Sequence, residues 1–185
     1  MSRDGGLLTL VDESTAGPGA DVLRAVLTER GRVVNFYRMM ANSPAIARPV
    51  FELVWALWHD THLDRADVEL IILRVARTTG SEYEWVSHAP LARAAGVTDD
   101  QLRALSDQAD PRTDPAFEDR QRAMLTVVDE VTTGIVSPAA SVTGFTDAFS
   151  EAERVEIMTI AGLYRGIAAM LRSFDVPLDD AGPER

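Results

Sequence analysis

A nearly unbroken apolar run in the middle of the chain, ELIILRVA at 69–76, constrains the fold more than any other segment. In the helix that contains this run, large apolar side chains recur at helical spacings and also fill most of the remaining circumference: Val68, Leu70, Ile71, Ile72, Leu73 and Val75. The predicted helix begins near Asp64, continues to Thr79 and stops at Gly80. A helix that is apolar on nearly every side has to be surrounded by other elements of the fold.

Apolar residues recur with the helical period along the rest of the chain, and Gly and Pro residues mark the boundaries between the predicted helices. Further helices are predicted over 21–31, 42–60, 81–95, 98–105, 117–134, 137–149 and 150–174, with a loop at 110–115. Strand patterns are weak everywhere. The sequence therefore predicts an all-α, single-domain bundle of about seven to nine helices.

The two ends of the chain have a different composition from the middle. Residues 1–19 and 179–185 are rich in small and polar residues, which predicts a flexible arm and a flexible tail around a helical domain at 20–178. Acidic residues interrupt the N-terminal segment where a signal peptide would stay apolar. No apolar run approaches the roughly 20 residues that span a bilayer. A cytoplasmic protein without a membrane partner is the expectation.

Charge and composition exclude several function classes. The net charge of −11 disfavours nucleic acid as a partner, because phosphate contacts need a positive field. The absence of cysteine removes thiol redox chemistry, disulfides and thiolate metal sites. All 18 basic residues are arginine, which excludes a lysine Schiff base and a lysine general base. Acid–base chemistry is left to carboxylates, tyrosines and three histidines.

The segment SEYEWVSH, at 81–88, gathers several of those groups. Glu84 and His88 are four residues apart and share one helix face, where a carboxylate beside an imidazole forms an acid–base pair. The same spacing has a purely structural interpretation. Ser81 and Glu84 fit a capping box, and His88 is then an ordinary buried histidine. The sequence leaves both hypotheses open.

Glu69 lies inside the apolar helix, where an unpaired carboxylate is costly. The arginines that follow it, Arg74 and Arg77, are out of phase with it on a helix. Its partner is therefore expected from another helix. Both a structural hydrogen-bond anchor and a catalytic acid or base remain as interpretations of Glu69.

The other candidates are weaker. His59 and His62 flank Asp60, but the spacing is loose, and a histidine at a helix C-terminus is favoured by the helix dipole without any metal. No metal site is predicted there. Arg165 is an isolated charge in a long apolar helix, suited to a substrate carboxylate or to a buried glutamate. The tryptophans are pocket candidates, although large aromatic side chains belong to cores more often.

Three segments resemble one known family. LDRADVELIILRVARTTGSEYEWVSHAPLARAAGV and its flanking helices ANSPAIARPVFELVWALW and FSEAERVEIMTIAGLYRGIAAMLRSFDVPL are similar to the carboxymuconolactone decarboxylase family, which includes the alkyl hydroperoxidase D-like proteins. The redox branch has a glutamate, a C-x-x-C pair 12 and 15 residues later, and a histidine four residues beyond. Here those positions are Glu69, Ser81, Glu84 and His88. Without cysteines, thiol peroxidase or disulfide reductase activity is excluded.

The resemblance implies the chemistry of the decarboxylase branch, which needs neither cofactor nor metal. Its substrates are small unsaturated carboxylates or lactones, and loss of CO2 leaves a dienolate to be protonated. By this resemblance His88 is the proton donor, Glu84 orients it, and Glu69 is a second acid–base group or an anchor. Tyr83, Trp85 and Arg165 are the substrate-binding candidates. A homotrimer or homohexamer is also implied. The alternative is a non-catalytic helical oligomer or a small-ligand-binding protein.

Overall fold

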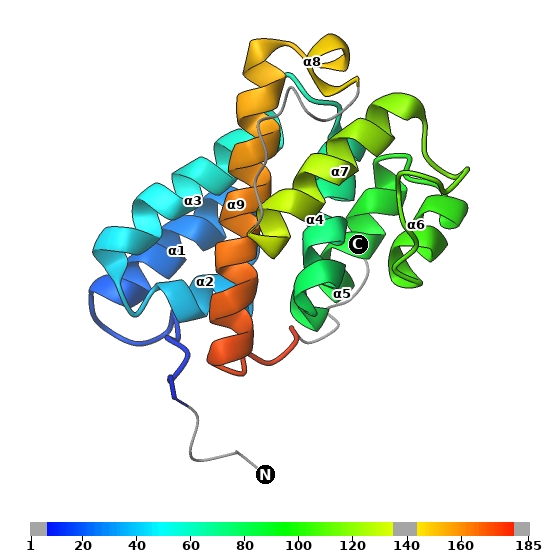
Figure 1. Ribbon diagram of the computed structural model, residues 1–185. Helices are drawn as coiled ribbons and strands as arrows, with labels where there is room; N and C mark the ends of the chain where they lie inside the picture. The colour runs from blue at the N-terminus through cyan, green and yellow to red at the C-terminus, as the bar shows by residue number, and fades with distance from the viewer. Residues whose placement is uncertain (1–6, 135–143, 180–185) are drawn as a thin grey trace. The chain divides into compact units, whose positions relative to one another are not determined.

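The computed structural model describes residues 7–134 and 144–179, and every regular element within these ranges is a helix. The nine described helices are α1 (Pro18–Arg30), α2 (Asn35–Met40), α3 (Pro44–His59), α4 (Arg65–Thr79), α5 (Glu82–Ala94), α6 (Asp99–Ser106), α7 (Asp119–Thr133), α8 (Phe145–Ala148) and α9 (Glu151–Ser173) (Figure 1). The predicted all-α class is confirmed. Of the helix predicted over 137–149, residues 137–143 lie outside the described ranges, and α8 is the helical part that is described.

The chain divides into two compact units. One comprises Met1–Trp55 with Leu171–Arg185, and the other comprises Ala56–Met170. The helix α3 begins in the first unit and ends in the second, and α9 begins in the second and ends in the first. Within the described residues, no helix is both long enough and apolar enough to cross a membrane.

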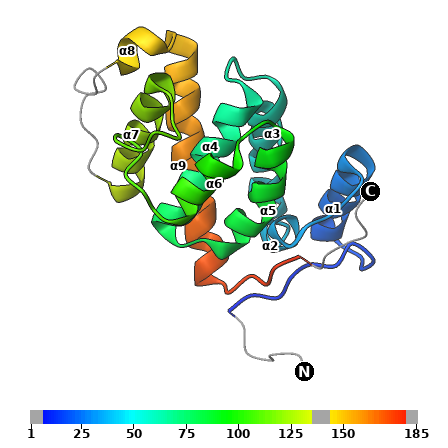
Figure 2. The ribbon, with the colours of Figure 1, turned by 90° about the vertical axis from the view of Figure 1, so that its right-hand side faces the viewer.

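The second unit is built around α4. This helix packs against α5, α6 and α7, and α7 also packs against α8 (Figure 1 and Figure 2). Ten successive residues of α4, from Asp67 to Ala76, are buried. The prediction of a helix enclosed on nearly every side is therefore confirmed. Its apolar side chains share one core with large residues from the surrounding elements, among them Leu105, Phe117, Met124, Leu125, Phe145, Ile157 and Ile160.

The first unit contains the described parts of the predicted arm and tail. In the arm, the backbone N–H of Val11 donates to the carbonyl of Arg38, and the Arg38 guanidinium pairs with Glu13. In the tail, the carbonyl of Pro177 accepts a hydrogen bond from Asn35 at 3.1 Å. Specific contacts with α2 therefore hold both segments.

A close helix approach in the first unit predicts a large difference between two Gly-to-Ala substitutions. A Cβ on Gly19 in α1 would lie 2.6 Å from the carbonyl oxygen of Ala41. Gly19→Ala is expected to lower the free energy of unfolding by about 2 kcal/mol, because the backbone of Ala41 has to move. Gly166→Ala in α9 is the control, since nothing lies within 4 Å of its added methyl group. It should stabilise by about 0.5–1 kcal/mol through helix propensity. Urea denaturation measures both, and equal effects would contradict the predicted clash.

Candidate functional site

The turn between α4 and α5 positions the candidate site. Gly80 ends α4 with a left-handed backbone, at φ 68° and ψ 32°, a conformation that residues with a side chain rarely adopt. One residue later Ser81 precedes the first residue of α5, so the two helices follow each other directly and pack together. This arrangement brings Glu69, in the middle of α4, opposite His88 in α5.

Glu69 and His88 form a buried pair. The Nδ1 atom of His88 lies 2.9 Å from Oε2 of Glu69, whose side chain is 0% exposed. The other carboxylate oxygen of Glu69 accepts a hydrogen bond from Arg65, one turn earlier on α4. A carboxylate can only accept, so Nδ1 carries the hydrogen of this bond, and Nε2 is the nitrogen available for other chemistry. The expected partner from another helix is thus His88. Sequence analysis missed Arg65, although its four-residue spacing from Glu69 was a usable signal.

Two aromatic residues enclose the imidazole. The ring of Trp58, in the last turn of α3, lies 5.6 Å from that of His88, and the ring of Tyr164, in α9, lies 5.4 Å from it, both edge-on. The indole Nε1–H of Trp58 donates to the Tyr164 hydroxyl at 2.9 Å. The Arg65 guanidinium lies over the Trp58 ring, 3.8 Å from its centre. These contacts fix the ring of His88 from three elements of the second unit.

Glu84 lies one turn before His88 on α5 and is only 2% exposed. Neither of its carboxyl oxygens has a hydrogen-bond partner within the described part of the chain. Burial raises the pKa of Glu84 to about 8, and the Ser81 hydroxyl nearby opposes this rise only in part. Ser81 and Glu84 nevertheless lack the geometry of a hydrogen bond. At neutral pH Glu84 is therefore a protonated carboxylic acid.

Both sequence-based interpretations of Glu84 need correction. The imidazole of His88 is oriented by Glu69 and not by Glu84. The capping box is also absent, because the Ser81 side chain accepts no backbone hydrogen bond at the start of α5. Spacing of four residues places two side chains on one helix face, but it does not decide which of them meets a group from the neighbouring helix.

The three predicted substrate-binding residues differ in exposure and in the contacts that they make. Tyr83 is buried in α5, and Trp85 is partly buried with the Arg77 guanidinium 3.7 Å from the centre of its ring. Arg165 is exposed, and one of its nitrogens would lie 3.6 Å from a Cβ on Gly134. The residue of α9 that contacts His88 is Tyr164, which directly precedes Arg165 in the chain. One residue turns a helix by about 100°, which is why the charge that stood out in the sequence faces elsewhere.

The two remaining histidines also belong to the second unit. His62 is exposed, and its Nδ1 lies 2.7 Å from Oε1 of Glu156. This hydrogen bond raises the pKa of His62. His59 is exposed as well. Over the ranges that the structure describes, no group of three or more His, Asp or Glu side chains is placed to hold a metal ion.

Comparison with known proteins supports the family resemblance. Residues 44–130 match the carboxymuconolactone decarboxylase family. Over 96% of this chain and 94% of the other, the fold is similar to that of a cysteine-to-alanine variant of the debrominase Bmp8 in complex with 2,3,4-tribromopyrrole, with 17% identity and a TM-score of 0.76. An uncharacterised peroxidase-related protein from Silicibacter sp. TM1040 has 16% identity over the same shares and a TM-score of 0.75.

A third similar structure is the alkylhydroperoxidase AhpD core of an uncharacterised peroxidase-related protein from Ralstonia eutropha JMP134. It has 20% identity and a TM-score of 0.73, over 95% of this chain and 93% of that one. At these identities the likeness concerns the fold. No curated protein matched the sequence. The match over residues 44–130 and the shared helical fold thus support the resemblance to the carboxymuconolactone decarboxylase family, and the chain has an alkyl hydroperoxidase D-like fold without any cysteine.

Proposed function

We propose that this protein is a cofactor-independent lyase or isomerase that transfers a proton on a small unsaturated carboxylate or lactone. The observation that carries the proposal is the buried pair of Glu69 and His88, whose Oε2 and Nδ1 atoms lie 2.9 Å apart. By resemblance, these two residues match the glutamate and histidine of the family's redox branch. A buried imidazole held through Nδ1 by a carboxylate is suited to give and take a proton at Nε2. The match of residues 44–130 to the carboxymuconolactone decarboxylase family supports the class of substrate.

The proposed reaction needs few protein groups. When a substrate carboxylate leaves as CO2, the bonding electrons stay on the remaining organic anion as a dienolate. The His88 imidazolium then gives its Nε2 proton to carbon and becomes neutral, and it regains a proton from solvent before the next turnover. Glu69 holds the ring through Nδ1 during both steps. Glu84 is one turn away on α5 and, as a neutral acid, supplies a second proton donor.

Turnover by a His88 variant tests the proposal. His88→Ala is expected to lower the rate of CO2 release or isomerisation at least about 100-fold, across a panel of lactones and unsaturated carboxylates. Added imidazole should restore part of that rate. His62→Ala is the matched control, because His62 also pairs with a glutamate but has an exposed side chain. It should keep full activity.

Two outcomes would contradict this function. Equal turnover by His88→Ala and the unchanged protein would leave the imidazole with a structural role only. A complete absence of turnover by the unchanged protein on the whole panel would favour the alternative, a protein that binds a small ligand without converting it. Thermal denaturation of each variant separates a loss of chemistry from a loss of folding, since a midpoint within a few degrees shows that the fold is intact.

A further inference from the structure

Tyr164 has a hydroxyl hydrogen for which the described residues provide no hydrogen-bond acceptor. Because an indole N–H can only donate, the Tyr164 oxygen is the acceptor in its 2.9 Å hydrogen bond with Trp58. The phenol O–H is therefore left to donate in another direction. Over the described residues, no acceptor receives it. The hydroxyl can therefore donate one hydrogen bond to a bound molecule without losing its bond from Trp58.

The surroundings keep this hydroxyl protonated. Tyr164 is 4% exposed, and its burial raises the pKa of the phenol above the ordinary range, with the carboxyl groups of Glu69 and Glu84 adding to the rise. Tyr164 therefore remains a hydrogen-bond donor in alkaline solution as well as at neutral pH. In this respect it differs from Glu84, which ionises near pH 8.

The hydrogen bond from Trp58 also makes Tyr164 a stronger donor. The Arg65 guanidinium over the Trp58 ring draws electron density from the indole, whose N–H in turn polarises the Tyr164 hydroxyl. The phenol ring lies edge-on to His88, the group assigned to proton transfer. The ring of the donor and the ring of the proton-transfer group are therefore in direct contact.

A second observation points to a bound molecule at this place. Both oxygens of Glu84 and the hydroxyl of Ser81 are buried without a partner among the described residues, although buried polar groups nearly always have one. Glu84 lies one turn before His88 on α5, and Ser81 directly precedes that helix.

We propose that the Tyr164 O–H donates to the substrate oxygen on which negative charge develops, and that it thereby selects substrates with an enolate, dienolate or phenolate oxygen. This inference rests on the proposed function and assigns its oxyanion-binding residue. No bond is made or broken at Tyr164, since the hydroxyl keeps its proton and gives only a hydrogen bond. Such a donor favours the charged intermediate over the neutral substrate.

The affinity of the protein for a phenolate measures the hydrogen bond from Tyr164 to an oxyanion, and it requires no turnover. The probe is 4-nitrophenol at pH 7.5, where it is partly ionised, titrated against the protein and followed by absorbance. Tyr164→Phe is expected to weaken binding of the phenolate about 10- to 100-fold, the usual effect of losing a hydrogen bond to a charged oxygen. Binding of 4-nitroanisole, which has the same ring but no oxyanion, should stay unchanged.

Two further variants sharpen the experiment. Trp58→Phe keeps an aromatic ring but removes the hydrogen bond to Tyr164, so phenolate binding should weaken by a smaller factor. Tyr37→Phe is the control, because the Tyr37 hydroxyl also accepts a hydrogen bond, from Arg30 at 2.5 Å, but belongs to the first unit. The Tyr37→Phe variant should bind the phenolate as tightly as the unchanged protein does. If Tyr164→Phe does not fold, the unchanged protein still gives an answer, since binding should increase the ionised fraction of 4-nitrophenol.

Several results would overturn the assignment. These are equal phenolate binding by Tyr164→Phe and the unchanged protein, equal weakening of both probes, or no binding of 4-nitrophenol to the unchanged protein. The first would leave the proposed role of His88 intact. Conversely, full turnover by His88→Ala together with weak phenolate binding by Tyr164→Phe would remove the proposed lyase while keeping an oxyanion-binding site.

Discussion

Replacement of Glu84 by Gln is expected to remove most of the loss of stability that the unchanged protein shows between pH 5 and pH 8. Burial raises the pKa of Glu84 from 4.5 to about 8. Over that window the folded protein keeps the proton that the unfolded chain has released. The free energy of unfolding therefore falls as pH rises, by about 4 kcal/mol from this one group. Below pH 4.5 both states are protonated, and the group has no effect.

Urea denaturation at pH 5 and pH 8 measures this difference. Glu84→Gln has no titrating group at this position, so its stability should change much less than that of the unchanged protein. Glu82→Gln is the control, because Glu82 lies two residues earlier on α5 with a side chain that is 66% exposed. It should retain the full pH dependence. An equally steep loss of stability in Glu84→Gln would show that Glu84 is ionised in the folded protein and is no neutral acid.

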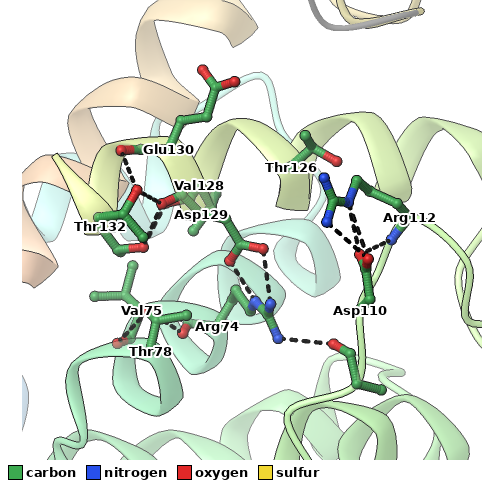
Figure 3. A network of polar contacts seen from close by, with 12 residues as sticks. Arg74, Val75, Thr78, Asp110, Arg112, Thr126, Val128, Asp129, Glu130 and Thr132 are labelled. Atoms are coloured by element: carbon green, nitrogen blue, oxygen red, sulfur yellow. Dashed lines mark hydrogen bonds and ion pairs between the residues drawn. The ribbon is translucent and has the colours of Figure 1, made fainter. Parts of the chain in front are cut away.

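Loss of Asp129 is expected to cost about 3 kcal/mol, whereas loss of Asp110 should cost less than about 1 kcal/mol. Figure 3 shows the two pairs close together. Arg74 of α4 binds both oxygens of Asp129 in α7, at 2.6 and 2.8 Å, and donates to the carbonyl of Ala109 at 3.1 Å. Its side chain is 8% exposed, so removal of Asp129 leaves a buried charge without a carboxylate.

The second pair in that figure supplies the comparison. Arg112 and Asp110 form an ion pair at 2.9 Å, but water reaches both side chains and screens their attraction. Chemical denaturation of Asp129→Ala and Asp110→Ala compares the two directly. Adding Arg74→Met to Asp129→Ala should recover much of the lost stability, because the buried charge is then gone as well. Equal costs for the two aspartate variants would mean that Arg74 does not depend on Asp129.

The architecture was largely predictable because it follows from local patterns. The apolar period of α4 requires burial on nearly every side, and the structure buries it that way. The predicted stops at Gly31, Gly80 and Gly134 all have left-handed backbones at the ends of α1, α4 and α7. The helical period and the conformation of a glycine depend on residues nearby in the chain, so both can be predicted from a single sequence.

The site was predictable only in part. Glu69 and His88 were candidates, but the sequence assigned the orientation of His88 to Glu84, which shares its helix, and not to Glu69 on the neighbouring helix. Trp58 and Tyr164, which lie 106 residues apart in the chain, were not recognised as a hydrogen-bonded pair. Arg165 stood out in the sequence, while its neighbour Tyr164 is the residue that faces the imidazole.

The amino-acid sequence by itself determined most of the helices, which helix is enclosed, and that no thiol chemistry is available, but it did not predict the short helix α2. Only the tertiary structure decided that the imidazole meets a carboxylate from α4, that Glu84 stays buried and protonated, and that a phenol from α9 lies beside them. The physical reason is that contacts between helices depend on how their axes cross and on which faces meet. Spacing along the chain fixes neither.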